Sequence, residues 1–432
     1  MNFALRTGPH LAYLLDYKLN GVLMMGSGFL GSTGSKAYAF LFAFVLILIP
    51  FLSVPAIARP GSPEVLSKAS EIPLNGLKFT GQKIQSTQAQ FTIPEKTLSA
   101  QVEIKGLPDR LYIVDSLEGP NSKPLVVNHL DQLPPQNLPQ ELSSLDAALA
   151  HLYGEEGGYS ALPQYLSPIR SEPGIEPGTA TLLLVAPPGK TLSAGNYQLR
   201  VRQISVSPSP HTLEGRVLLK SAGRHSKSLK LLFVLTGVRG WKRNHRDLSL
   251  FVDYLKPILQ QADLVVKPSF LELDLQDFHN LDTAEQMNSL FSQFESHKKG
   301  QNRGVDDRFL PVFLVNRFDL IGNVSYSPGI PGPCSSLFKG VGVIASIGET
   351  NLSLAEHATT LAHEIGHFLG LRHIYESTSR FLVDDLEDTP ARAEIKPNEY
   401  WLMDPRPSVR GGVIPRLSPR QSEILKAHWL VH

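Results

Sequence analysis

The stretch that decides the architecture of this chain is His363-Glu364-Ile365-Gly366-His367-Phe368-Leu369-Gly370-Leu371-Arg372-His373. Its first two histidines are four residues apart, so on an α-helix both imidazoles project from the same face. Gly370 can adopt a positive φ, which would end the helix and turn the chain sharply. That turn would bring His373 back towards the other two. The spacing therefore predicts a helix that stops near Gly370 and three histidines gathered beside its end.

Three imidazoles that converge in this way are typical of a zinc site. Three protein ligands with one open position define a catalytic zinc ion, whereas a fourth protein ligand would close the site. We predict that His363, His367 and His373 hold zinc and that Glu364 acts on the zinc-bound water as general base. The alternatives are a helix whose histidines are satisfied by ordinary hydrogen bonds and a closed structural zinc site.

The sequence immediately before the motif indicates where its helix begins. Ser353 with Glu356 three residues later is a capping box, which predicts a helix from about 354 to 369. Leu354, Ala358, Leu361, Ala362, Ile365 and Leu369 would form its apolar stripe. The ligands lie beside this stripe, so we expect a core-anchored helix that presents the histidines to a cleft.

Outward from the motif, residues 228–432 read as alternating strands and helices. Strands are expected at 229–235, around 264–274, at 310–316 and at 340–346, and helices at 248–259 and 284–297. This alternation favours an α/β or α+β layered domain.

The preceding region has a different pattern, in which short alternating runs dominate. Strands are expected at 98–105, 111–116, 180–186, 196–202 and 214–220, with one helix near 140–153. These predict a β-sandwich-like domain over 96–225, preceded by an irregular leader over 59–95. The fold class is therefore α+β, with two domains. The β domain could be an accessory module or a pro-region that is removed, and nothing in its sequence decides between them.

Residues 37–57 are almost wholly apolar and are followed by the small-x-small pattern Ala56-Ile57-Ala58. This favours a signal peptide over 1–58, so the protein would be secreted or periplasmic. The alternative is an uncleaved membrane anchor formed by the same apolar segment.

The overall composition narrows the possible partners. Lys+Arg 41 against Asp+Glu 40 gives a net charge of +1 over 432 residues, so we expect no nucleic-acid partner. The one cysteine, Cys334, excludes intramolecular disulfides. We read it as a free thiol, with a zinc-blocking thiolate as the alternative.

The motif matches HExxHxxGxxH, and the chain from about 228 onward resembles the metzincin zinc peptidases, which implies an α/β/α zinc peptidase domain. The resemblance implies a methionine-containing turn beneath the metal, for which Met403 in Tyr400-Trp401-Leu402-Met403-Asp404-Pro405 is the natural candidate. Asp388-Thr389-Pro390 and the segment 327–333 (Ser-Pro-Gly-Ile-Pro-Gly-Pro) are similar to the pappalysin branch. The branch also implies that the strand at 340–346 is an antiparallel edge strand that pairs with substrate. The chain departs from the pattern in two features. Pappalysins usually carry more cysteines in this domain, and many metzincins have a tyrosine where this chain has Pro405.

The resemblance implies a zinc-dependent endopeptidase with a protein or peptide substrate. Two alternatives remain open: a secreted binding or adhesion protein with a catalytically silent domain, and a zinc aminopeptidase. The sequence does not indicate an oligomeric state.

Several further residues have two interpretations each. Asp384, Asp385, Glu387 and Asp388 could bind Ca²⁺ or form a solvated loop. His357 is expected on the helix surface, and His428 and His432 are expected in a terminal helix without a role. Asp404 could brace a ligand histidine or cap its own loop.

Overall fold

The computed structural model describes residues 70–127 and 178–432, apart from short gaps at 83, 109, 123, 206–208, 224–226, 274, 301–307, 319–324, 336, 339–340, 349–350, 376–383, 385, 391–393, 397–398 and 406–412. Val65–His432 form one compact unit, separate from Met1–Glu64.

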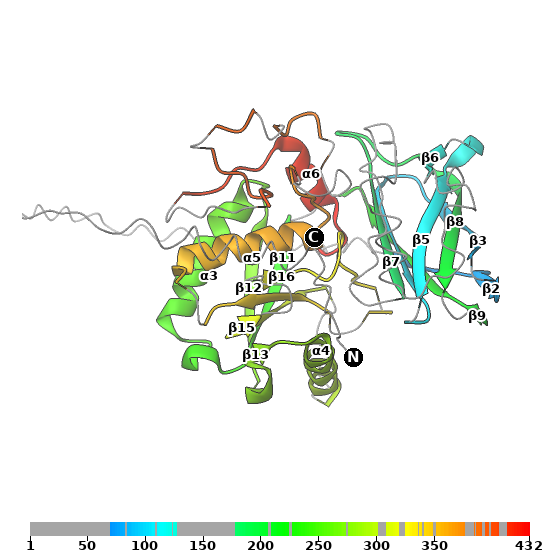
Figure 1. Ribbon diagram of the computed structural model, residues 1–432. Helices are drawn as coiled ribbons and strands as arrows, with labels where there is room; N and C mark the ends of the chain where they lie inside the picture. The colour runs from blue at the N-terminus through cyan, green and yellow to red at the C-terminus, as the bar shows by residue number, and fades with distance from the viewer. Residues whose placement is uncertain are drawn as a thin grey trace, which may run out of the picture. The chain divides into compact units, whose positions relative to one another are not determined.

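The first half of this unit consists of two four-stranded antiparallel sheets (Figure 1). One has the order β1 (Ser70–Leu74), β10 (Glu214–Ser221), β4 (Thr97–Lys105), β7 (Thr179–Val185). The other has the order β3 (Ile84–Ile93), β8 (Gly195–Ser205), β5 (Arg110–Glu118), β6 (Pro124–Val127). A short pair, β2 (Lys78–Thr80) with β9 (Pro210–Thr212), completes this half, which we call the sandwich.

All five strands expected from alternation in this region are present. The irregular leader expected over 59–95 is wrong for its second part, because β1, β2 and β3 lie there and pair with β10, β9 and β8. Prolines and polar residues weaken the alternating pattern of these strands. Their pairing partners also lie more than a hundred residues away in the sequence, so local spacing does not reveal them. The helix expected near 140–153 falls outside the described residues.

Alternation explains how strand β4 is used on both faces. Ala100, Val102 and Ile104 point into the sandwich core, where they are fully buried. The intervening residues are polar, as on a strand with one wet face. Ser99, Gln101 and Glu103 are nevertheless 2%, 1% and 0% exposed, because residues of the second half cover them.

The second half is built on a five-stranded sheet of order β12-β11-β14-β17-β16. Its strands are β11 (Ser228–Leu235), β12 (Val265–Glu272), β14 (Leu310–Val315), β16 (Ser325–Tyr326) and β17 (Val343–Ser346). All neighbours are parallel except β16, which runs antiparallel to β17. The helices are α3 (Arg246–Gln260), α4 (Ala284–Gly300), α5 (Leu354–Phe368) and α6 (Pro419–Ala427). Shorter elements of this half are η3 (Val238–Gly240), η4 (Gln276–Phe278) and the ribbon of β13 (Asn280–Leu281) with β15 (Arg317–Phe318). The short helix η1 (Pro120–Ser122) belongs to the sandwich, where it precedes β6.

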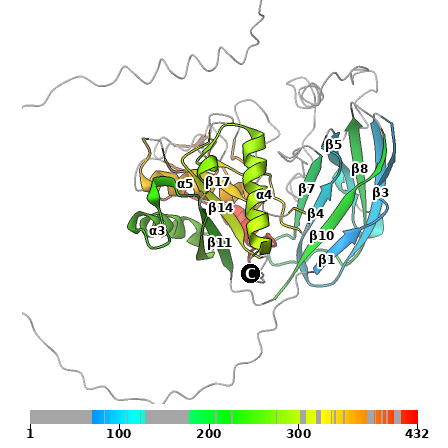
Figure 2. The same ribbon diagram turned by 90° about the horizontal axis from the view of Figure 1, so that it is seen from below.

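Helices cover both faces of this sheet. Phe233 and Val312 pack with α3 and α5 in one cluster, whereas Val234 and Phe313 pack with α4 in another. Adjacent strand residues thus point to opposite layers, as expected for a parallel sheet buried on both sides. Figure 2 shows α4 on the side of the sheet away from α3 and α5. The mixed α+β class predicted from the sequence is confirmed.

The expected position of the edge strand is wrong. The strand at 343–346 is internal and parallel to β14, and the antiparallel outermost strand is β16. The resemblance to the pappalysin branch implied the edge position for 340–346, and the two residues of β16 are too few to give a periodic signal of a further strand.

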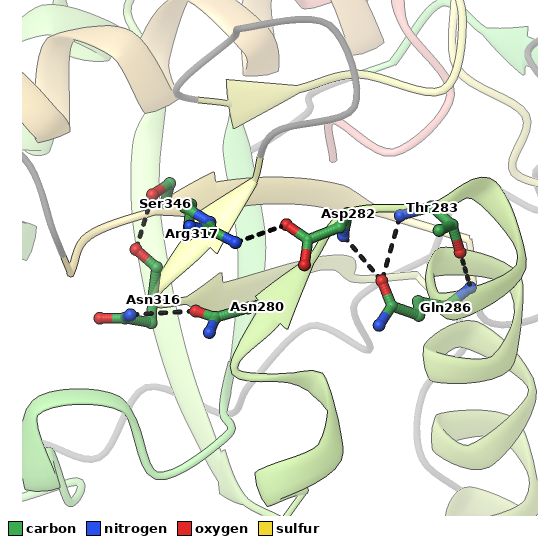
Figure 3. Close-up of polar contacts among 7 residues, drawn as sticks. All are labelled: Asn280, Asp282, Thr283, Gln286, Asn316, Arg317 and Ser346. Atoms are coloured by element: carbon green, nitrogen blue, oxygen red, sulfur yellow. Dashed lines mark hydrogen bonds and ion pairs between the residues drawn. The ribbon is translucent and has the colours of Figure 1, made fainter.

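The ribbon β13–β15 is fastened by polar side chains near the carboxyl end of β14 (Figure 3). Asn316 Nδ2 donates to Asn280 Oδ1 at 3.0 Å, and Arg317 pairs with Asp282 at 2.9 Å. Ser346 Oγ at the end of β17 donates to the Asn316 carbonyl at 2.8 Å. These bonds fix the path of the chain into α4.

Within the described residues, no helix is both long enough and apolar enough to span a membrane. The apolar segment 37–57 lies outside them.

Candidate metal centre

Helix α5 carries the first two histidines, and its start is fixed by a complete capping box. Ser353 Oγ accepts from Glu356 N at 3.3 Å, and Glu356 Oε2 accepts from Ser353 N at 2.6 Å. The apolar stripe packs in the core, where Leu361 and Ile365 are fully buried. The predicted helix from about 354 to 369 is confirmed, and its buried stripe sets the direction of the histidine face.

The structure brings the three predicted ligands together. His373 Nε2 lies 3.1 Å from His363 Nε2 and 3.0 Å from His367 Nε2. One ligand atom from each ring falls within 4.8 Å of the others, and no other such group occurs among the described residues. Three nitrogens at zinc-ligand distance from a tetrahedral ion would be about 3.3 Å apart, so the spacing suits such an ion.

Backbone carbonyls set the tautomers of two rings. His363 Nδ1 donates to the Leu402 carbonyl at 2.6 Å, and His367 Nδ1 donates to the Leu371 carbonyl at 2.8 Å. Their Nε2 atoms therefore carry lone pairs when the rings are neutral. Burial lowers the pKa of His363 to about 3 and that of His367 well below its usual value. Lone pairs from these two neutral rings thus face His373 Nε2 at about 3 Å, an arrangement that a cation bound by the three nitrogens would satisfy.

Gly370 produces the predicted turn. Its φ is +104°, and its N–H donates to the His367 carbonyl at 2.9 Å. A side chain at this position would be strained, and its Cβ would lie 2.9 Å from Leu183 Cδ2. Glycine is therefore the residue that lets the chain leave α5 and return as His373.

The turn that contains Met403 lies directly under the histidines. Met403 is fully buried, and a Cβ at Gly366, between the first two ligands, would lie 2.7 Å from its sulfur. The Met403 carbonyl also accepts from Ile374 N at 3.0 Å, just after the third ligand. Together with the Leu402 carbonyl on His363, this turn supports two of the three ligands.

Glu364 is placed beside strand β16. Ser325 Oγ donates to Glu364 Oε1 at 3.3 Å. Removal from water raises the pKa of Glu364 to about 7, and the hydrogen bonds from Ser325 and from the backbone of Ser327 oppose that rise. A carboxylate in this environment can accept and release a proton near neutral pH.

Sequence reasoning missed Ser325, Ser327 and the two carbonyls that orient the histidines. Ser325 and Ser327 carried no periodic or spacing signal. The resemblance of the segment 327–333 to the pappalysin branch was the one available hint, because this segment begins at Ser327 and lies two residues after Ser325.

Other predicted residues have different surroundings from those expected. His357 is 2% exposed rather than on the helix surface, and burial lowers its pKa to about 4. Asp404 Oδ1 accepts from Tyr375 Oη at 2.8 Å, and backbone carbonyls brace His363 and His367. His428 follows the end of α6 and is fully buried. Cys334 is a free thiol, as expected.

The acidic cluster gives no support for calcium. Asp384 accepts from Thr389 Oγ1 at 2.5 Å and from Gln421 Nε2 at 2.9 Å. Asp388 Oδ2 accepts from Arg420 N at 2.8 Å. Asp385 lies outside the described residues. Asp384 and Asp388 therefore fasten α6 to the loop after His373.

A helix with two histidines, a glycine turn to the third and a buried methionine below them define a metzincin-like peptidase region in the C-terminal part of the chain. Consistent with this, residues 345–402 match the family model Peptidase_M43, described as pregnancy-associated plasma protein-A. The matched interval contains Glu364 and the three histidines and ends one residue before Met403. The predicted resemblance to metzincins of the pappalysin branch is confirmed for this region.

Among solved structures, metalloproteinase-II from Bacteroides fragilis is similar, with 17% identity over 40% of this chain and 56% of that one and a TM-score of 0.28. The chain thus spans little more than half the length of that protein. The protein YxiM from Bacillus subtilis shows 8% identity over 56% of this chain and 66% of its own, with a TM-score of 0.12. A search of curated proteins finds no match.

Proposed function

We propose that this protein is an exported zinc-dependent endopeptidase. The observation that carries the proposal is the convergence of His363, His367 and His373. Nε2 of His373 lies 3.1 Å from that of His363 and 3.0 Å from that of His367, and Glu364 follows the first ligand directly. These three nitrogens would hold the zinc ion. When bound, zinc supplies Lewis acidity, which makes water more acidic and polarises a carbonyl group.

Glu364 is the general base in this proposal. Its carboxylate takes a proton from the attacking water and returns it to the nitrogen of the leaving amine. Ser325 Oγ and the Ser327 backbone hold that carboxylate in place through hydrogen bonds. Because β16 carries Ser325 and is the outermost strand, an extended peptide that pairs with β16 would pass next to Glu364.

The decisive experiment is cleavage of casein by the purified protein. We expect cleavage that a chelator stops and added Zn²⁺ restores. Glu364→Ala should lower kcat by at least about a thousandfold and leave one zinc per chain, because Glu364 is not a ligand. Unchanged cleavage by that variant would contradict the assignment of the base.

A blocked peptide separates the alternatives. Internal cleavage of a peptide with an acetylated N-terminus is expected for an endopeptidase and is impossible for an aminopeptidase. Zinc binding without any cleavage would favour the silent adhesion protein.

Export rests on the sequence 37–57 and the pattern Ala56-Ile57-Ala58. Mass spectrometry of the native protein would reveal a start at Arg59 if the signal is cleaved. A mass that includes residues 37–57 would instead favour the membrane anchor.

A further inference from the structure

A polar face of the sandwich is buried against the second half of the unit, residues 228–432, which we call the peptidase half. On β4, Ser99, Gln101 and Glu103 all donate to or accept from residues that lie more than two hundred positions later in the sequence. A strand face that only had to shield a core would carry apolar residues here, since buried polar groups are costly unless they are paired.

Glu103 makes the most specific of these contacts. Its side chain is fully buried, and its two oxygens accept from consecutive backbone N–H groups, Cys334 N at 2.8 Å and Ser335 N at 2.9 Å. Gln101 Nε2 also donates to Glu103 Oε1 at 2.7 Å. Two acceptors on two successive amides fix both the position and the orientation of that peptide.

Two more sandwich side chains bind the same stretch. Gln101 Nε2 donates to the Gly332 carbonyl at 2.9 Å, and Thr181 Oγ1 on β7 donates to the Pro331 carbonyl at 2.8 Å. The path of the chain over 331–335 is therefore held by three buried side chains from two neighbouring strands.

The held stretch continues directly to the peptidase site. Gly332 N donates to the Phe368 carbonyl at 2.9 Å, and Phe368 follows the ligand His367. A Cβ on Gly332 would lie 2.2 Å from the Phe368 ring, so the contact is close. At its other end the same segment supplies Ser325, which binds Glu364. We call residues 325–335 the bracing segment.

We propose that Glu103 is a positioning residue of the peptidase site, which acts through the bracing segment on Glu364 and on the last turn of α5. The inference rests on the proposed peptidase function. It also assigns the sandwich a role: it belongs to the active enzyme as a permanent part and is not a removed pro-region.

The first test measures hydrogen exchange in the full chain and does not depend on activity. Glu103→Gln keeps the size of the side chain but replaces one acceptor oxygen by a donor, so one of the two N–H bonds is lost. We expect faster exchange at Cys334 and Ser335 and also at 325–332 and 366–371. Ser99→Ala is the matched control, because Ser99 lies on the same strand and binds the Ala427 carbonyl instead. Two results would overturn the proposal. In one, Glu103→Gln speeds up exchange only at 334–335; in the other, Glu103→Gln and Ser99→Ala speed up exchange equally at 366–371.

The second test is kinetic. We expect Glu103→Gln to lower kcat about tenfold with KM changed less than about twofold and with zinc content unchanged, while Ser99→Ala stays within about twofold of the parent. Thr181→Val, which breaks the bond to Pro331, should act in the same direction, so the test survives if Glu103→Gln does not fold.

A double-mutant cycle then tests the route. If Glu103 acts on Glu364 through the bracing segment, the double variant Glu103→Gln/Ser325→Ala should lose less kcat than the product of the two single fold-losses. Multiplicative effects would overturn the proposed route. Absence of cleavage by the parent protein would refute the peptidase function, and the exchange experiment would still decide whether Glu103 is coupled to the site.

Discussion

For single residues, the site depends on hydrogen bonds that orient the ligand nitrogens of His363 and His367 and the carboxylate of Glu364. The Leu402 and Leu371 carbonyls accept hydrogen bonds from Nδ1–H of His363 and His367. Nε2 of each ring is therefore unprotonated and has a lone pair available for a metal ion. Ser325 occupies one oxygen of Glu364. The chemistry of the motif is thus prepared by residues outside it.

The bond from Ser325 to Glu364 should be measurable in catalysis. Ser325→Ala removes a hydrogen bond to a carboxylate, and such bonds contribute about 1.5–3 kcal/mol, so kcat/KM should fall about tenfold or more. Ser296→Ala is a suitable control, since Ser296 Oγ binds only the Ser292 carbonyl within α4. Equal rates for the two variants in a casein assay would show that Ser325 does not hold the base.

At the scale of elements, α5 and the turn after it could be predicted almost completely. The capping box, the stripe and Gly370 all lie within one helix and its exit, where spacing alone determines which groups meet. Strand β16 could not be predicted, because two residues carry no period and their pairing depends on β17.

Replacement of the turn glycine tests this element directly. Gly370→Ala forces a side chain into a left-handed conformation and towards Leu183, which should lower the free energy of unfolding by about 2 kcal/mol or more and displace His373. Urea unfolding and zinc titration would measure both effects. Gly300→Ala is the matched control, because no atom lies within 4 Å of a Cβ there and φ is not in the left-handed range.

At the scale of the whole molecule, the sandwich and the peptidase half share a polar interface at two places. Besides the bracing segment, Lys220 Nζ donates to the carbonyls of Lys426, His428 (3.1 Å) and Val431 (2.6 Å). Leu183 of β7 also joins the core cluster formed by α3 and α5. Unfolding of the two halves should therefore be coupled.

This interface makes stability sensitive to acid. Burial, with a smaller contribution from Lys220, lowers the pKa of His428 to about 3, against 6.5 in the unfolded chain. The unfolded state binds the proton more readily, so this contribution to stability is complete above pH 6.5 and is lost as the pH falls towards 3.

His428→Asn isolates that contribution, because Asn can keep the acceptor that Leu430 N uses. The variant should be less stable at pH 7, but between pH 6.5 and 4.5 it should lose roughly 2 kcal/mol less than the parent, since each pH unit corresponds to about 1.4 kcal/mol per proton. Urea unfolding at both values measures the difference, and parallel losses in the two proteins would contradict a neutral buried His428.

Features whose partners are close along the chain could be predicted: the zinc motif on its capped helix, the turn at Gly370, and most strands and helices around it. Long-range packing determines the remaining features: which strand forms the edge, which carbonyls orient the histidines, what holds Glu364, and what covers the polar face of β4. Glu103 and Cys334 are 231 positions apart, so no spacing rule relates them. A strand over 98–105 places Glu103 on the same face as Gln101, but whether that face meets water or protein depends on how the two halves pack.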